Sequence, residues 1–297
     1  MLVKKKTLAN KFLVELIKIF KEHNWDVETS ENGEYSVFDM FCERLEELDD
    51  DSDRELMLEL THNYLWVNSY EYEKYMTEVF RKFLDTNKES MKRIQTIHIF
   101  PVQDKDYPSK TKSGNFICYL FQGTFSRKFK EFRDKRVRVI ETFDAIEKYK
   151  DDIECLILID DYVGSGDTLL GCVSLIEEKG IKKEDIKAIT LVLQESGKKI
   201  VEDYGIDIYS SIIRNKAITD NYSSDIVEKK IEQMKRIGKK LKVKKKMYLG
   251  YKESEGLVTM IKTPNNTLPF YWYEGKRDGK FMMAPFPRRN NIGDVVS

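Results

Sequence analysis

The sequence predicts an α/β protein with a mostly parallel sheet flanked by helices. The first observation is a series of short aliphatic and β-branched runs without polar alternation, which is typical of strands buried on both faces. The second is that helical segments fall between the later runs. The third is a glycine-containing loop directly after one run, at the kind of strand end where open α/β sheets bind their ligands.

The predicted elements follow from hydrophobic spacing. From Leu8 to about Leu84 apolar residues recur at helical intervals, which predicts a helical N-terminal region. The predicted strands are Ile94–Val102, Phe116–Gln122, Val137–Phe143, Cys155–Ile159, Ala188–Leu193 and Ile206–Ile213, and the clearest helices between them are Leu169–Lys179 and Lys198–Tyr204. From Tyr248 onward Pro, Asn and aromatic residues predict a cap of strands and loops.

A chain of 297 residues accommodates a domain of ordinary size and a smaller part. We expect a helical N-terminal region at residues 1–90, an α/β core at 91–215, and a basic helix with a C-terminal hood at 216–297. The hydrophobic content of 41% is sufficient for a packed core.

Charge is balanced overall but unevenly distributed. Lys plus Arg equals Asp plus Glu at 51 each, so net charge favours neither nucleic acid nor a membrane. The segment Asp26–Glu59 is acidic, whereas Ile226–Met247 carries ten Lys or Arg against two Glu. The basic stretch Lys229–Lys246 is therefore interpreted either as a solvated amphipathic helix or as the contact site of a protein or nucleic-acid partner.

Cysteine and histidine usage excludes several site types. The four cysteines are scattered without a C-x-x-C pair, which argues against a zinc site and a disulfide framework and favours reduced thiols in a cytoplasm. The three histidines make an imidazole triad improbable, and we expect His98 to be a hydrogen-bonded core residue. The amphipathic segment Thr7–Lys21 is no signal-peptide core, and no apolar stretch is long enough to span a membrane, so we expect a cytoplasmic protein without a membrane partner.

The most informative segment follows the predicted strand Cys155–Ile159. Two adjacent acids, Asp160 and Asp161, precede the sequence Tyr-Val-Gly-Ser-Gly-Asp-Thr and an apolar helix. Glycines allow close backbone approach to an anion, and the positive end of the helix dipole favours one. The predicted phosphate-binding residues are Gly164, Ser165, Gly166, Asp167 and Thr168. A carboxylate just before this loop is placed to accept hydrogen bonds from ribose hydroxyls.

Other kinds of loop share some of these residues. It is compatible with an ordinary strand and turn in which Asp167 or Thr168 caps the next helix. A dinucleotide-binding site is disfavoured because the loop lacks a third glycine and follows the acids. A Walker-type loop is excluded because Gly-Lys-Ser/Thr is missing.

The segment resembles the signature of the phosphoribosyltransferase family, in which four apolar residues, two acids and two apolar residues precede a Thr- and Gly-rich loop ending in Thr. The resemblance implies a type I phosphoribosyltransferase-like fold. It matches Asp160 and Asp161 to the acids that contact ribose, and Ser165, Gly166 and Thr168 to the 5-phosphate loop. Tyr162 and Gly164 depart from the usual residues, which puts ordinary nucleotide-salvage activity in doubt.

A second resemblance lies in the C-terminal part, where Thr263–Trp272 reads T-P-N-N-T-L-P-F-Y-W. This element resembles phosphoribosyltransferase-like proteins of bacterial conflict and antiphage defence systems, some of them retron-associated. It implies a defence effector or regulator without identifying a substrate. We expect either a structural turn with an anchoring tryptophan, or a hood that lines the sugar-phosphate site and comprises Asn265, Asn266, Trp272 and Arg288.

The resemblance also implies a ligand set. A phosphoribosyl pyrophosphate or nucleotide ligand would be bound with Mg²⁺, through Asp160, Asp161 and the ribose hydroxyls. The loop after the first core strand contains Lys112, Ser113 and Gly114 at the position expected for a pyrophosphate loop. A transferase or nucleotide-processing enzyme, a non-catalytic nucleotide or phosphoribosyl pyrophosphate sensor, and a scaffold module all remain compatible with the sequence.

Overall fold

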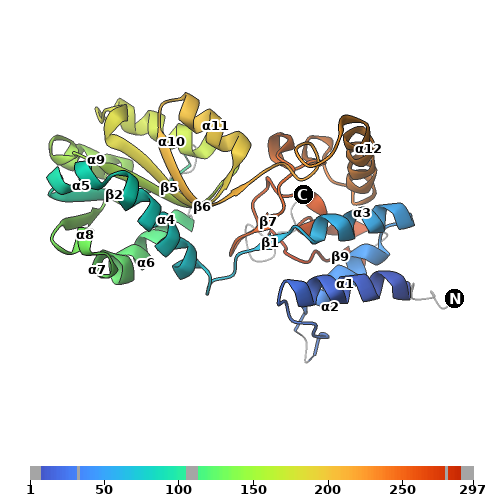
Figure 1. The fold of residues 1–297 in the computed structure, drawn as a ribbon. Coiled ribbons are helices and arrows are strands. Elements are labelled where there is room, and N and C mark those ends of the chain that lie inside the picture. Colours follow the sequence, from blue (N-terminus) through green and yellow to red (C-terminus); the bar gives the residue numbers. More distant parts are fainter. Residues whose placement is uncertain (1–7, 32–33, 105–112, 278–279, 289–297) are drawn as a thin grey trace. The chain divides into compact units, whose positions relative to one another are not determined.

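The computed structural model describes residues 8–31, 34–104, 113–277 and 280–288, and the chain forms two compact units (Figure 1). The first unit combines the described residues of Met1–Asn68 and Lys216–Ser297, and the second is Ser69–Asn215. This differs from the three-part division expected from the sequence. The N-terminal helices share a unit with the C-terminal segment, and the helices between residues 72 and 93 belong to the α/β unit.

The second unit is built on a five-stranded sheet in the order β3-β2-β4-β5-β6. Its strands are β2 (Thr96–Pro101), β3 (Arg136–Val139), β4 (Leu156–Val163), β5 (Ile186–Gln194) and β6 (Asp207–Arg214). Every neighbouring pair in this sheet is parallel. The predicted α/β class with a mostly parallel sheet is therefore confirmed.

Helices cover both faces of this sheet (Figure 1). They are α4 (Tyr72–Thr86), α5 (Lys88–Arg93), α6 (Ser113–Leu120), α7 (Ser126–Lys128), α8 (Lys130–Arg133), α9 (Phe143–Tyr149), α10 (Asp167–Glu178) and α11 (Glu195–Asp203). On one face α4 packs on β5 and β6, and α6 packs on β2 and β4. On the other face Leu156 and Leu158 of β4 share a core with Val173 and Ile176 of α10. The strands are apolar on both faces because both are covered.

One predicted strand is wrong. The segment Phe116–Gln122 lies in helix α6 and the π-helical turn η1 (Phe121–Phe125) that follows it. Its buried residues Gly114, Ile117, Cys118 and Phe121 recur at helical spacing, which a short apolar run does not distinguish from a strand. The predicted strand Val137–Phe143 is shorter than expected, because Thr142 caps α9 by accepting from the Ala145 amide.

The strand order fixes where a ligand site belongs. From the first strand, β2, the chain passes to β3 on one side and then returns to β4 on the other. The order therefore reverses between β2 and β4. In doubly wound sheets the crevice at the carboxyl ends of such a strand pair is the usual binding site. The acids and the glycine loop predicted from the sequence lie at this end of β4.

The first unit joins distant parts of the chain in one aromatic core. Its helices are α1 (Asn10–Glu22), α2 (Val37–Glu46), α3 (Asp51–Thr61) and α12 (Ser224–Lys240), with short turns η4 (Lys245–Met247), η5 (Tyr251–Glu253) and η6 (Pro269–Tyr271). Strand β1 (Leu65–Trp66) pairs in parallel with β7 (Val258–Thr259), and β8 (Gly275–Arg277) pairs antiparallel with β9 (Lys280–Met282). Tyr64 stacks on Phe286 with ring centroids 5.2 Å apart. Neither terminal segment completes this core alone.

The described residues also bear on the excluded site types. No helix among them is long and apolar enough to cross a bilayer.

All four cysteines are free, and burial raises the pKa of the Cys118 and Cys172 thiols to about 12. His98 is fully buried in β2, but neither ring nitrogen has a hydrogen-bond partner within the described part of the chain. The expected hydrogen-bonded histidine is thus a buried, unpaired one, and burial lowers its pKa.

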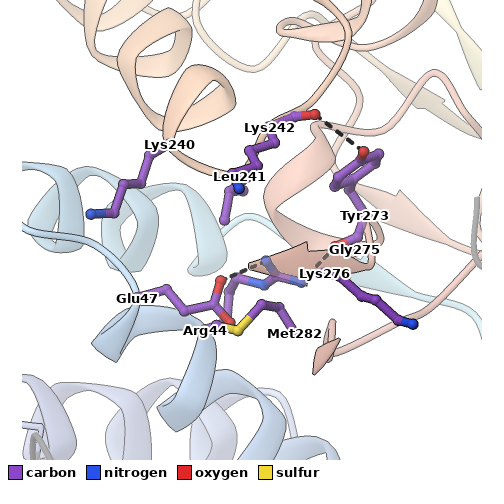
Figure 2. Close-up of a pocket in the computed structure, with 9 residues that line it drawn as sticks. All are labelled: Arg44, Glu47, Lys240, Leu241, Lys242, Tyr273, Gly275, Lys276 and Met282. Carbon is purple, nitrogen blue, oxygen red and sulfur yellow. Dashed lines mark hydrogen bonds and ion pairs between the residues drawn. The ribbon is translucent and has the colours of Figure 1, made fainter. Parts of the chain in front are cut away.

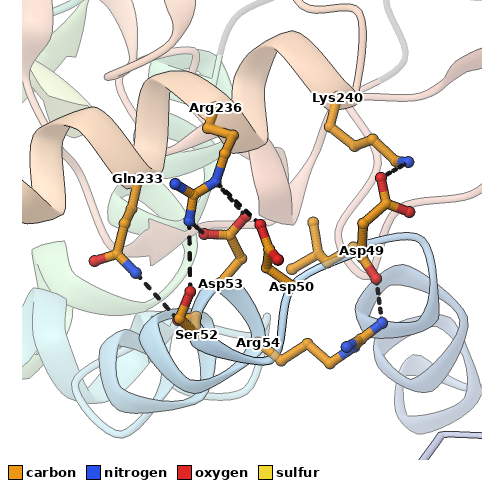
Figure 3. A network of polar contacts seen from close by, with 9 residues as sticks. Asp49, Asp50, Ser52, Asp53, Arg54, Gln233, Arg236 and Lys240 are labelled. Carbon is orange, nitrogen blue, oxygen red and sulfur yellow. Dashed lines mark hydrogen bonds and ion pairs between the residues drawn. The ribbon is translucent and has the colours of Figure 1, made fainter.

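The acidic and basic segments of the first unit pair with each other (Figure 3). Arg236 of α12 donates to the buried Asp53 of α3, with its Nε 3.0 Å from Oδ2. Lys230 pairs with Glu59, and Lys240 pairs with Asp49. Three of the ten cations of Ile226–Met247 therefore form ion pairs with the acidic segment.

Arg236→Gln should destabilise the first unit by about 1–2 kcal/mol, because it leaves the buried Asp53 carboxylate without its cation. The matched control is Lys229→Gln on the same helix. Lys229 is exposed and makes no ion pair within the described residues, so a change below about 0.5 kcal/mol is expected. Urea unfolding followed by tryptophan fluorescence measures both. Equal effects of the two substitutions would remove Asp53 pairing as a source of stability.

Candidate functional site

Two hydroxyl groups converge on the acid pair at the carboxyl end of β4. The Ser113 Oγ lies 2.8 Å from Asp160 Oδ1 and 2.6 Å from Asp161 Oδ1. The Tyr72 hydroxyl donates to Asp161 Oδ2 at 2.7 Å. Helices α4 and α6 thus hold the acids from one face of the sheet. Tyr72 was not predicted, since nothing in its local sequence indicates contact with a residue 89 positions later.

The acids are poorly suited to remain ionised without a ligand. Burial, followed by the charge of Asp161, raises the pKa of Asp160 well above its usual range. Burial also raises the pKa of Asp161, while hydrogen bonds from Ser113 and Tyr72 oppose that shift. One serine hydrogen serves only one carboxylate fully at a time. Within the described residues neither acid forms an ion pair with Lys or Arg, so the pair favours a proton, a cation or a hydroxyl-bearing ligand.

Gly114 brings α6 close enough to deliver Ser113. A Cβ atom added at Gly114 would lie 2.6 Å from the Ile159 carbonyl oxygen and 3.1 Å from the Val102 nitrogen. No side chain fits there, so the helix start lies directly against β2 and β4. Of the residues predicted for a pyrophosphate loop, Ser113 contacts the acids, Gly114 has this packing role, and Lys112 lies outside the described residues.

The loop after the acids is short and has no side-chain cap. Residues 164–166 connect β4 to α10, and Gly166 at the N-cap has a left-handed φ of 83°. The N-cap position is Gly166, so neither Asp167 nor Thr168 occupies the N-cap that the ordinary-turn interpretation gives them. The first amides of a helix have no partner within it. The hydroxyls of Ser165 and Thr168 make no hydrogen bond to another described residue, so α10 presents polar hydrogens suited to an anion.

Gly197 of helix α11 packs directly against this loop. A Cβ atom at Gly197 of α11 would lie 2.0 Å from the Gly164 carbonyl oxygen and 3.3 Å from the Gly166 nitrogen. The Tyr162 hydroxyl donates to Gln194 Oε1 at 2.8 Å, and both residues are buried. The departure from the family pattern at Tyr162 therefore fastens β4 to the end of β5. The sequence gives no local signal for either contact.

The predicted hood residues lie in the first unit, where each has a local partner. Asn266 Nδ2 donates to Ser254 Oγ at 2.7 Å, and the Asn265 carbonyl accepts from the Tyr251 amide. Trp272 Nε1 donates to the Thr267 carbonyl at 2.7 Å, and Arg288 Nη1 donates to the Thr263 carbonyl at 2.8 Å. Their role as a hood over a sugar phosphate stays a prediction.

A parallel sheet that carries paired acids and a glycine loop at its order reversal defines a phosphoribosyltransferase-like protein. The chain belongs to the PRTase-CE family, whose model matches residues 42–288. The matched range includes the acid pair, the loop and the C-terminal element.

Curated relatives match only a part of the chain. A xanthine phosphoribosyltransferase of Clostridium acetobutylicum is 35% identical over 68 residues, which is 22% of this chain and 34% of that protein. Xanthine phosphoribosyltransferase 1 of Clostridium botulinum is 33% identical over 67 residues, again 22% and 34%. The chain thus spans about a third of the length of the curated relatives it matches.

Solved structures show only distant similarity. Orotate phosphoribosyltransferase from Aeropyrum pernix is 12% identical with a TM-score of 0.29, and the match covers 46% of this chain and 70% of that one. The HGPRT-ase from Leishmania tarentolae in complex with GMP is 19% identical with a TM-score of 0.29, covering 46% and 72%.

Gly197→Ala should displace the Gly164–Gly166 loop, because the added methyl group would overlap the Gly164 carbonyl. We expect a loss of about 1–3 kcal/mol in the free energy of unfolding, typical of overpacking. Gly123→Ala is the matched control, since a Cβ atom at Gly123 meets nothing within 4 Å. Thermal unfolding measures both. A Gly197→Ala protein as stable as the control would contradict tight packing beneath the loop.

Asp160→Asn should stabilise the protein at neutral pH. A carboxyl group whose pKa is raised by folding favours the folded state below its unfolded pKa of about 4, and this contribution is lost as the pH rises through the folded-state pKa. The amide carries no such pH-dependent cost. The gain over the parent should therefore grow from about pH 4 to pH 8, as measured by unfolding at several pH values. Substitution of the exposed Asp151 by Asn is the control. If the stability gained by Asp160→Asn did not change with pH, burial would not be the cause of a raised Asp160 pKa.

Proposed function

We propose that the chain binds a ribose 5-phosphate ligand, either phosphoribosyl pyrophosphate or a nucleotide, together with Mg²⁺. The observation that carries this proposal is the succession, along one strand, loop and helix, of the half-buried Asp160, the buried Asp161 and a helix start without a side-chain cap. Amides and hydroxyls of residues 165–168 hold the phosphate, and Asp160 and Asp161 accept hydrogen bonds from the ribose hydroxyls. One continuous segment then holds both ends of a sugar phosphate.

The acid pair fits a magnesium ion. Carboxylate oxygens are hard ligands, and Mg²⁺ usually keeps several waters and needs only one or two carboxylates from the protein. No cluster of three or more His, Cys, Asp or Glu suited to a metal occurs among the described residues, so this site would depend on Asp160, Asp161 and oxygens of the ligand. When bound, the ion supplies positive charge that offsets pyrophosphate and the desolvated acids.

In an enzyme, these residues would act at the anomeric carbon of the ligand. The loop fixes the 5-phosphate, while the two carboxylates orient the ribose diol and stabilise positive charge that develops on the ring. Tyr72 and Ser113 position the acids through hydrogen bonds rather than touching the reacting atoms. Transfer to an acceptor, pyrophosphorolysis and hydrolysis are all consistent with such a site.

A non-catalytic sensor is the second candidate. It is favoured by the departures at Tyr162 and Gly164, which adapt the loop to packing on Gln194 and Gly197. In that case ligand binding changes contacts with a partner and no bond is broken. The C-terminal T-P-N-N-T-L-P-F-Y-W element supports a role in bacterial antiphage defence for either candidate. Exposed lysines of Lys229–Lys246 that make no internal ion pair offer a contact surface for a protein or nucleic-acid partner.

The decisive variant is Asp160→Asn with Asp161→Asn. Phosphoribosyl pyrophosphate with Mg²⁺ should stabilise the parent by about 2.7 kcal/mol at a hundredfold excess over Kd, and the double variant should lose most of this shift. Asp151→Asn with Asp152→Asn is the matched control, because those adjacent acids are exposed on a turn outside the site. Thermal shift measures binding.

Pyrophosphate release and base transfer then separate the two candidates. An enzyme should lose turnover by about two orders of magnitude or more in the double variant, as expected when preorganised charge is removed. A sensor shows no turnover in the parent, yet loses binding in the same variant. Binding by the double variant that equals the parent would rule out the sugar-phosphate assignment of Asp160 and Asp161.

A further inference from the structure

Among the described residues, two side chains have buried nitrogen atoms without a hydrogen-bond partner, Arg44 and His98. In Arg44 only Nε is unpaired, because Nη1 donates to Glu47 and Nη2 donates to the Tyr273 carbonyl (Figure 2). In His98 neither ring nitrogen has a partner, although the residue is fully buried. Buried polar groups are normally hydrogen-bonded, because their loss of water is otherwise uncompensated. The described residues therefore leave the hydrogen-bonding capacity of this imidazole unused.

His98 lies in β2, next to an edge strand of the sheet. It is opposite Arg138 of β3 on one side and opposite Leu156 of β4 on the other. Strand β3 pairs only with β2 and its residues are exposed or half-buried, whereas β4 is a central and largely buried strand. Separation of β3 from β2 therefore displaces no other strand and exposes less apolar surface than separation of β2 from β4.

The groups around the imidazole disfavour a positive charge on it. The Arg138 guanidinium carbon lies 4.2 Å from the centroid of the Tyr149 ring of α9, and that ring lies 6.2 Å from the His98 ring. Asp152 after α9 and Glu154 before β4 act in the opposite direction, but both are exposed, so water screens their charges. Burial, followed by the charge of Arg138, lowers the pKa of His98. The folded sheet thus favours a neutral imidazole, and an opened sheet accepts a protonated one.

We propose that His98 makes the β3 edge of the second unit responsive to acid: when the imidazole takes up a proton, β3 separates from β2 and the imidazolium reaches water. An apolar side chain would fill the same position without unpaired polar atoms, so the histidine makes this edge less stable than it could be. Opening leaves unpaired the backbone groups of β2 that face β3, alongside the normally buried Ile97 and Ile99. The response is separate from ligand binding at the acid pair.

The direction of the response follows from proton linkage. A histidine whose pKa is lowered by folding contributes its full stability above its unfolded pKa of about 6.5, and this stability is lost as the pH falls through that value. Each pH unit below it should raise the equilibrium constant for opening by about tenfold, until the folded-state pKa is reached. Asp160 and Asp161 act in the opposite direction, since carboxyl groups with a raised pKa reduce stability as the pH rises.

Amide hydrogen exchange of the full chain between pH 5 and 8 measures this opening, once each rate is corrected for its intrinsic dependence on pH. The Ile140 amide donates to the Ile99 carbonyl at 2.8 Å and reports on the pairing of β3 with β2. The Val102 amide donates to the Ile159 carbonyl at 2.9 Å and reports on the pairing of β2 with β4. Protection of Ile140 should fall by about tenfold per pH unit below about pH 6.5, and protection of Val102 should fall much less.

His98→Leu should remove the pH dependence of Ile140 protection, because leucine does not titrate. His98→Gln also lacks the titration while retaining a polar side chain, so it should do the same even if leucine repacks the core. The matched control is His62→Gln, which removes a histidine of the first unit and should leave the pH dependence as in the parent.

Two measurements on the parent decide the proposal even if a variant does not fold. Protection of Ile140 that stays constant from pH 7 to 5, or that falls equally with that of Val102, would overturn it, since the edge then does not open separately. An unchanged pH dependence in both His98 variants would assign the response to another group and would also overturn it.

Discussion

Desolvation of two adjacent carboxyl groups is the constraint on which the site depends. Asp160 and Asp161 lie at the end of a central strand, covered by helices, and burial raises the pKa of both. Natural proteins place acids in such positions when function requires it, because an uncompensated buried charge reduces stability. Among the described residues, compensation comes from the hydroxyls of Ser113 and Tyr72 and from the Asp161 amide, which donates to Asp160 Oδ1 at 2.9 Å. A cation or sugar hydroxyls would complete it.

Close backbone approach sets the geometry around these acids. Gly114 allows α6 to lie against β2 and β4, and Gly197 allows α11 to lie against the Gly164–Gly166 loop. In both places a methyl group would overlap a carbonyl oxygen. Each glycine is therefore far in sequence from the segment that packs against it: Gly114 packs against Ile159, and Gly197 packs against Gly164. The loop conformation depends on the packing of α11 as well as on the flexibility of its own glycines.

The two units use charge in different ways. In the first unit α3 and α12 compensate each other, and the Arg236–Asp53 pair places a carboxylate in a buried position that tolerates it. In the second unit the acids have no such partner among the described residues. The net charge of zero thus combines a unit in which three cations of α12 are paired with acids and a site in the other unit that favours an external cation.

The sequence by itself determined the α/β class, the β4–loop–α10 segment and the acid pair, because these depend on local spacing and on residues adjacent in the chain. It did not determine that Phe116–Gln122 is helical, since a short apolar run fits either period. Only the tertiary structure brought Tyr72 and Ser113 to the acids and joined the two ends of the chain in one aromatic core. Those contacts arise between residues far apart in sequence, where side-chain packing, and not local preference, selects the partners.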